Sequence, residues 1–392
     1  MIRDASTSAD TTPTRAVTGA LTTTIAVTLP VFLVGGLAVQ IGEELGFSPA
    51  GLGLAVSAYF ATSAVASVPA GWLVERYGST AVSRCGIALA SLSLLGIAVG
   101  ARSLGSLVAI LALGAGANAA GQLASNTSLS RLVPARRQGL SFGVKQAAIP
   151  VSTLLAGAAV PVVALTVGWR WAFVAAAVFA AGAIALVPAA RDRVVRRTGR
   201  SGRATGALVV LGVAATLAAA AANALGTFLV DSAVSRGIDP APAGLALTLG
   251  GAVCVVARVG GGWQADLRPG RQVGVIAGLL ACGAVGLALL AVPGTVPLVA
   301  GVVLGFGLGW SWPGLMNFAV VRLHPQAPAA ATSITQTGVY AGGAVGPLSL
   351  GGVASAAGYP TMWMVAACAM LLAGGCMILG SVLLRRHAAA RA

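Results

Sequence analysis

Apolar stretches of about 20 residues recur along the whole chain, and short polar segments separate them. An α-helix rises about 1.5 Å per residue, so about 20 apolar residues cross the roughly 30 Å hydrocarbon core of a bilayer. The pattern therefore predicts an all-α membrane protein with twelve transmembrane helices. The predicted spans are 17–40, 50–70, 81–100, 104–127, 140–163, 170–190, 206–230, 243–263, 272–292, 296–319, 329–354 and 361–384.

The composition agrees with lipid as the solvent for most of the chain. Charged residues make up 8% of the 392 positions, and the mean hydropathy is +0.91. A water-soluble domain of this length would lack the polar surface needed to cover it. The first fifteen residues are polar and contain no apolar core beside a small-residue cleavage site, so we expect no cleaved signal peptide.

The 24 basic residues follow a topological pattern. The predicted spans place nineteen of them on one side, whereas Arg102, Arg170 and Arg236 fall in the opposite loops. By the positive-inside rule the basic side is cytoplasmic, and an even number of spans puts both termini there. We therefore expect a multi-pass protein of the plasma (inner) membrane with both termini in the cytoplasm. Because topology accounts for the basic charge, we expect no nucleic-acid partner.

A basic segment divides the predicted spans into two groups of six, and the two groups resemble each other at an offset of 190 to 191 residues. Gly71 and Trp72, after the second span, recur as Gly262 and Trp263 after the eighth. Internal duplication is the economical explanation. The predicted segments are a cytoplasmic tail at 1–16, a six-helix bundle at 17–190, a basic cytoplasmic linker at 191–205, a second six-helix bundle at 206–384, and a cytoplasmic tail at 385–392.

The repeated loop carries a family resemblance. Its first copy reads Gly71-Trp72-Leu73-Val74-Glu75-Arg76-Tyr77-Gly78. A glycine, a spaced acid and a basic residue between the second and third helices resemble the cytoplasmic signature of the major facilitator superfamily. Together with the second copy at 262–271, the twelve spans and the basic linker, the resemblance extends over nearly the whole chain. It implies two pseudo-symmetric six-helix bundles and alternating access around a site between them.

The same resemblance implies a gating role for these loops, although Glu75 stands where the family usually has aspartate. A carboxylate at a helix end can pair with an arginine or accept from the free amides of another helix, worth about 0.3–1 kcal/mol. The alternative, that the charges only mark short cytoplasmic loops, stays open. The residues assigned to gating are Gly71, Glu75, Arg76, Gly78, Asp266 and Arg271.

Two cations lie inside predicted spans, where an ionisable side chain is costly to bury and tends to face a cavity. Lys145, the single lysine of the chain, lies five residues before Pro150 in the fifth span, and Arg258 lies in the eighth. The surroundings of Arg258 resemble those of an arginine in monocarboxylate and nitrate/nitrite porters, which implies pairing with an anionic substrate. The alternative is that both side chains extend to the cytoplasmic surface.

Polar side chains are almost absent from the third, sixth, ninth and twelfth spans and recur in the others. This distribution matches the superfamily, in which the other helices line the cavity. The alternative for each amide is a hydrogen bond to a neighbouring helix. The residues assigned to substrate binding are Arg258, Lys145, Gln146, Asn118, Gln122, Asn223, Tyr340, Gln336, Asn317 and Tyr59.

No carboxylate is predicted at mid-membrane. Many cation and drug exporters of the superfamily use a buried carboxylate as proton carrier, so its absence beside two cations favours an anionic substrate. The leading hypothesis is a secondary active transporter for proton-linked uptake or exchange of a small organic anion such as a monocarboxylate. Efflux of hydrophobic or amphipathic compounds is the alternative, and a non-transporting membrane sensor is a third hypothesis.

Catalysis is not expected, because the sequence contains no recognisable nucleophile–base pair. The five cysteines lie in apolar stretches without metal-ligand spacing, so we expect no metal and no other cofactor. The expected partners are the lipid bilayer, a small-molecule substrate and protons, and we expect a monomer.

Overall fold

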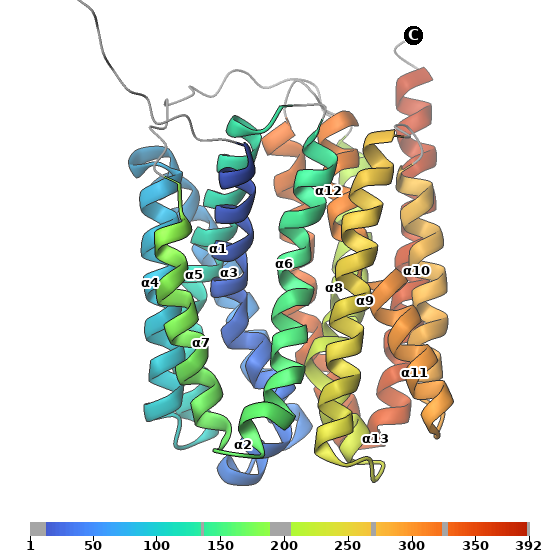
Figure 1. Ribbon diagram of the computed structural model, residues 1–392. Coiled ribbons are helices and arrows are strands. Elements are labelled where there is room, and N and C mark those ends of the chain that lie inside the picture. The colour runs from blue at the N-terminus through green and yellow to red at the C-terminus, as the bar shows by residue number, and fades with distance from the viewer. Residues whose placement is uncertain (1–12, 135–136, 189–204, 268–271, 324–327, 390–392) are drawn as a thin grey trace, which may run out of the picture.

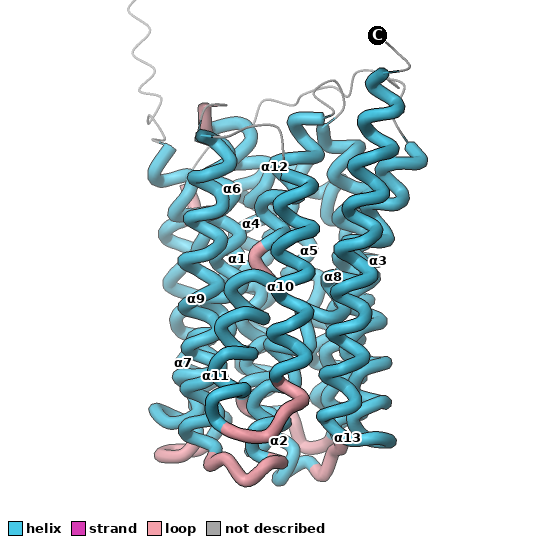
Figure 2. Tube along the Cα trace, turned by 90° about the vertical axis from the view of Figure 1, so that its right-hand side faces the viewer, coloured by secondary structure: helices cyan, strands magenta, loops and turns pink. Residues whose placement is uncertain are grey.

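The computed structural model describes residues 13–134, 137–188, 205–267, 272–323 and 328–389. These ranges are helical and contain no strand, and the helices stand side by side with short connections at the two ends of the molecule (Figures 1 and 2). The predicted all-α membrane fold is confirmed. Apolar side chains cover the outside, with Val68 82% and Leu113 78% exposed, as expected where lipid is the solvent.

The first half of the described chain, which we call the N-half, ends at Pro188. Its connections are short because glycine permits positive φ at tight turns, as at Gly78 between α3 and α4, with a φ of 86°. The N-half contains α1 (Pro13–Gly36), α2 (Ala38–Leu45), α3 (Pro49–Tyr77), α4 (Ser79–Gly100), α5 (Leu104–Leu132), α6 (Gln138–Ala159) with a π-helical end at Val160–Ala164, and α7 (Trp169–Ala183) with a 3₁₀ turn at Ile184–Leu186.

The second half, the C-half, repeats this arrangement. Gly168 before α7 has a φ of 99°, and Gly358, at an offset of 190 residues, breaks α13 with a φ of 82°. The same turn therefore recurs at the same place in both halves. The C-half contains α8 (Thr205–Val234), α9 (Pro240–Leu267), α10 (Gln272–Leu289), α11 (Thr295–Leu304), a π-helical piece at Gly305–Gly309, α12 (Trp312–Leu323) and α13 (Pro328–Ala389).

The described ranges contain eleven helical stretches long and apolar enough to span a membrane. The last of them, in α13, is broken at Gly358 and contains two spans, so the twelve predicted spans are all present. Two details differ from the prediction. The first span is followed by a separate short helix, α2, and the tenth is interrupted at mid-length between α11 and α12. The segment boundaries at 1–16, 191–205 and 385–392 remain predictions, because residues 1–12, 189–204 and 390–392 lie outside the described residues.

The start of α1 and the end of α13 lie at the same end of the bundle, and α2 lies at the other (Figure 1). We call these ends the terminal side and the α2 side. Across the two halves, α3 packs along α13, α6 packs along α9, and α1 contacts α8. On the α2 side these pairs meet backbone to backbone, with Gly53 against Pro347 and Gly157 against Gly244. Small residues allow such close packing where no hydrophobic effect drives helices together.

Candidate functional site

A cavity lies between the two halves. Phe32, Phe60, Trp310 and Trp312 give it aromatic walls, and amide side chains from both halves complete them. No residue of α4, α7 or α10 lines it, which agrees with the polar side-chain distribution along the sequence. Its remaining lining residues are Thr28, Asn118, Gln122, Gln146, Ile149, Asn223, Arg258, Pro313, Met316, Asn317, Thr335, Gln336, Val339 and Tyr340.

Eight of the ten residues assigned to substrate binding line this cavity, whereas Lys145 and Tyr59 do not. Lys145 is fully buried on α6, and its amine donates to the Oε1 atom of Gln122. Tyr59 is also buried, and its hydroxyl donates to the backbone carbonyl of Val27 on α1. Both side chains therefore support the wall from behind. Lys145 contacts the lining residue Gln122, and it does not extend to the surface.

Arg258 lines the cavity and is 2% exposed, so it does not extend to the surface either. Its Nη1 donates to the carbonyl of Gln146 at 2.6 Å, and its Nε and Nη2 donate to the carbonyl of Trp310 at 3.0 and 2.6 Å. The guanidinium is thus held by backbone carbonyls. Among the described residues no carboxylate lines the cavity, so the positive charge of Arg258 has no acidic partner there.

Three polar atoms of the cavity wall have no hydrogen-bond partner among the described residues. They are the acceptors Oδ1 of Asn118 and Oε1 of Gln146 and the donor Nε1 of Trp312. All three side chains are at least nine-tenths buried. Buried polar groups without partners are rare, because each costs about 1–3 kcal/mol. A ligand in the cavity could donate hydrogen bonds to the two amide oxygens and accept one from the Trp312 indole.

The sequence identified the polar lining but not the apolar part of it. Phe32, Phe60, Ile149, Met316 and Val339 lie on helices that are mainly apolar apart from a few polar residues. In such helices the apolar residues that face lipid and those that face a cavity are of the same types. Hydrophobic periodicity therefore cannot tell the cavity-lining ones from the lipid-facing ones. For Trp310 and Trp312 the sequence did offer a signal, because two aromatic residues beside Pro313 mark an interrupted helix.

The gating assignments have different structural surroundings. Asp266, at the end of α9, accepts hydrogen bonds from the amides of Gly139 at 3.1 Å and Leu140 at 2.8 Å. These amides belong to the first turn of α6, whose free N–H groups attract a carboxylate. The contact joins the two halves on the terminal side. Among the residues assigned to gating, Asp266 has the contact that best fits that role, which stays a prediction.

The first copy of the loop makes no such contact with the described residues. Glu75 is exposed and has no hydrogen bond or ion pair to any of them, and the Arg76 guanidinium lies over the rings of Trp72 at 5.2 Å and Tyr77 at 5.6 Å. A side chain at Gly71 would meet nothing within 4 Å, so this glycine permits no close helix approach. Arg271 lies outside the described residues.

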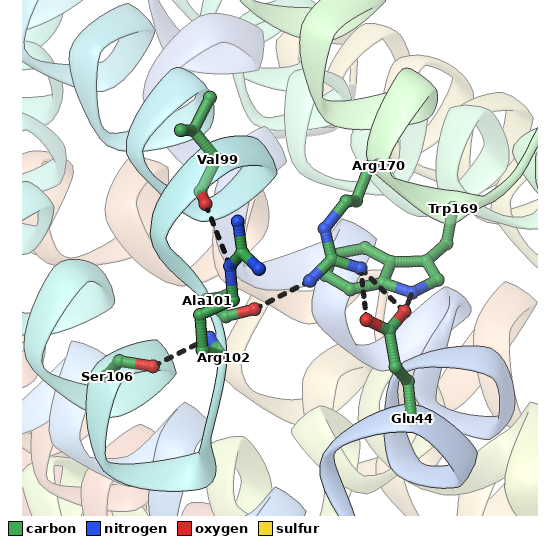
Figure 3. Close-up of polar contacts among 7 residues, drawn as sticks. All are labelled: Glu44, Val99, Ala101, Arg102, Ser106, Trp169 and Arg170. Carbon is green, nitrogen blue, oxygen red and sulfur yellow. Dashed lines mark hydrogen bonds and ion pairs between the residues drawn. The ribbon is translucent and has the colours of Figure 1, made fainter.

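A separate polar cluster lies on the α2 side, around Glu44 at the end of α2 (Figure 3). Glu44 accepts from the Arg170 guanidinium at 2.6 and 2.5 Å and from the Trp169 indole N–H at 2.7 Å. The Arg170 and Trp169 hydrogen bonds hold the pKa of the Glu44 carboxyl below its ordinary value. The cluster ties α2 to the start of α7, both in the N-half.

Two six-helix halves around a central cavity define a polytopic membrane transporter. The sequence profile of the Major Facilitator Superfamily matches residues 16–347 and, in a second match, 211–392. The chain belongs to the Major Facilitator Superfamily. A chloramphenicol resistance protein of Streptomyces lividans is 28% identical over 328 residues, which cover 81% of this chain and 83% of that protein.

Proposed function

We propose that the protein exports small aromatic, amphipathic compounds across the plasma membrane by alternating access, with the cavity as its binding site. The observation that carries the proposal is the cavity wall, which is aromatic and apolar with uncharged amides between. Such a wall suits an uncharged ligand with a few hydrogen-bonding groups. Both termini are cytoplasmic in this proposal, as the positive-inside rule predicts, and a proton gradient supplies the energy.

The relative from Streptomyces lividans supports export, because that protein is named for chloramphenicol resistance. The contacts of Arg258 also favour a neutral ligand. Three of its donor–acceptor contacts go to the carbonyls of Gln146 and Trp310, so the guanidinium is already largely occupied. An anion would have to replace these partners before it could form a bidentate pair.

Transport of a small organic anion is the second candidate, and one observation favours it. Arg258 is buried in the cavity wall, and no carboxylate of the described lining offsets its charge. A substrate carboxylate would supply that missing partner. In this version the substrate enters together with a proton, and Arg258 contacts it directly.

Flux measurements in proteoliposomes separate the two candidates. We would impose a pH gradient in each direction and compare radiolabelled chloramphenicol with radiolabelled lactate, with protein-free liposomes as the control. Export predicts chloramphenicol movement against its gradient, driven by protons moving the other way, and no movement of lactate. Lactate movement alone would support the anion candidate, and movement of neither compound would contradict both.

A further inference from the structure

The contacts of Arg258 join the two halves at the cavity. Arg258 belongs to α9 in the C-half, and so does its partner Trp310, between α11 and α12. Its other partner, the carbonyl of Gln146, belongs to α6 in the N-half. The guanidinium therefore makes two hydrogen bonds within its own half and one across the interface, all of them buried.

Both carbonyls are available because each lacks its usual helical N–H partner. In a regular helix the carbonyl of residue 146 would accept from the amide of residue 150, but Pro150 has no N–H. The carbonyl of Trp310 lies between the π-helical piece that ends at Gly309 and the start of α12 at Trp312. An unpaired carbonyl inside a membrane costs several kcal/mol, so each needs a donor from elsewhere.

The backbones of α6 and α9 are close enough for Arg258 to reach across. A Cβ atom at Gly143 would lie 2.8 Å from the carbonyl oxygen of Arg258, and a Cβ atom at Gly251 would lie 2.7 Å from that of Pro150. Side chains at these two positions would separate the helices. Gly143 and Pro150 on α6 and Gly251 and Arg258 on α9 thus meet at the same interface.

We propose that Arg258 is a positioning residue that tethers the two halves, holding α6 against α9 on the terminal side through the carbonyl that Pro150 leaves free. Opening of the cavity toward the terminal side breaks the bond to Gln146, while the two bonds to Trp310 move with the C-half. Asp266 makes the second contact of this interface, two turns nearer the terminal side. The tether acts in the same way whatever the identity or charge of the substrate.

The test measures the distance between the halves without any substrate. Spin labels on Ser130→Cys in α5 and Val275→Cys in α10 report the terminal-side separation by double electron–electron resonance. Both positions are exposed near the terminal ends of their helices, one in each half. The background variant has all five native cysteines replaced. The protein is reconstituted in lipid nanodiscs, and each variant is first checked for a monodisperse elution profile.

The decisive variant is Pro150→Ala, which gives the Gln146 carbonyl a helical N–H partner and leaves the charge of Arg258 in place. Because hydrogen bonds to charged groups contribute about 1.5–3 kcal/mol, we expect the ratio of long to short distances to rise about tenfold or more. Arg258→Lys should shift it in the same direction, since a single ammonium cannot reach both carbonyls. In the double variant, the ratio of long to short distances should rise no further than in the single variant with the larger effect. Both substitutions remove the same hydrogen bond, so their effects should not add.

Pro69→Ala is the matched control, because Pro69 lies in the interior of α3 and no described side chain donates to the carbonyl of Val65, four residues before it. It should leave the distance distribution of the parent unchanged. An unchanged distribution in Pro150→Ala would overturn the tether, even if Arg258→Lys shifts it, because the effect would then come from the side chain alone. An equal shift in Pro69→Ala would also overturn it, because loss of any helix proline would then be sufficient.

Discussion

At the scale of single residues, three polar atoms of the cavity wall lack hydrogen-bond partners among the described residues. Trp312 is 1% exposed, and its indole N–H has no acceptor among the described residues. A donor buried in this way is costly in the empty protein and becomes favourable when a ligand supplies an acceptor. The same holds in reverse for the acceptors on Asn118 and Gln146. Ligand recognition therefore depends on a few oriented polar atoms in an otherwise apolar wall.

Trp312→Phe tests this directly, because it removes the donor and keeps an aromatic ring in the wall. We expect chloramphenicol to bind about 2- to 10-fold more weakly by isothermal titration calorimetry, as for loss of one hydrogen bond. Trp263→Phe is the control, because Trp263 is 60% exposed near the end of α9 and away from the cavity. Equal affinities for the wild type and Trp312→Phe would show that the indole N–H does not contact the ligand.

Glu44 gives the second prediction at this scale. Its pKa is lowered by Arg170 and Trp169, so the ionised carboxylate stabilises the folded state. That stabilisation is complete above the ordinary value of 4.5 and is lost as the pH falls through the lower folded value. In thermal unfolding from pH 7 down to pH 3 in detergent, Glu44→Gln should start from a lower Tm and lose less of it below about pH 4.5 than the wild type. Glu43→Gln, at the exposed neighbouring position, should follow the wild type, and a steeper loss in Glu44→Gln would contradict the account.

At the scale of helices, the close approaches on the α2 side depend on glycine. A Cβ atom at Gly157 of α6 would lie 2.5 Å from the Gly244 carbonyl oxygen and 2.6 Å from the Thr248 nitrogen, both in α9. These neighbours are backbone atoms, which cannot rotate away as a flexible side chain can. The helices must therefore separate to accept even one methyl group.

Gly157→Ala should destabilise the protein by about 1–3 kcal/mol, as overpacking does in other close-packed sites, and lower its Tm by several degrees in a fluorescence-based thermal assay. Gly182→Ala in α7 is the matched control, because a Cβ atom there would meet nothing within 4 Å. The Tm of the control should equal that of the wild type or be slightly higher, since alanine favours the helix. A Tm for Gly157→Ala equal to that of the control would mean that α6 and α9 are not in contact there.

The helices were predictable from the sequence, and their irregular parts were not. Length and apolar composition are sufficient for a span, because the bilayer imposes both on any helix that crosses it. The tenth span is long and apolar enough for one helix, so length and mean composition predict no interruption at Trp310, and the local signal is Pro313 with its two neighbouring tryptophans. The burial of Lys145 was likewise not predictable, because its partner Gln122 lies on another helix and satisfies it without exposure.

At the scale of the whole molecule, the cavity is where the two halves separate. Gly53 and Gly157 bring the halves together on the α2 side, while Arg258 and Asp266 join them on the terminal side. The first set consists of small residues in van der Waals contact, and the second consists of polar bonds that can break and form again. In the proposed mechanism, rocking of one half against the other breaks and re-forms these contacts and exposes the cavity to each side in turn.

Alternating exposure of the cavity is the central claim, and the labelling of one cavity cysteine tests it most directly. Val339→Cys lies in the cavity wall on α13, and Val345→Cys on the same helix is 60% exposed toward lipid. In a cysteine-free background, right-side-out and inside-out vesicles would be treated with a membrane-impermeant maleimide, with and without chloramphenicol. The account predicts labelling of Val339→Cys from both sides, slowed by the compound, and no labelling of Val345→Cys from either side. Labelling of Val339→Cys from one side only, at a rate that the compound does not change, would contradict it.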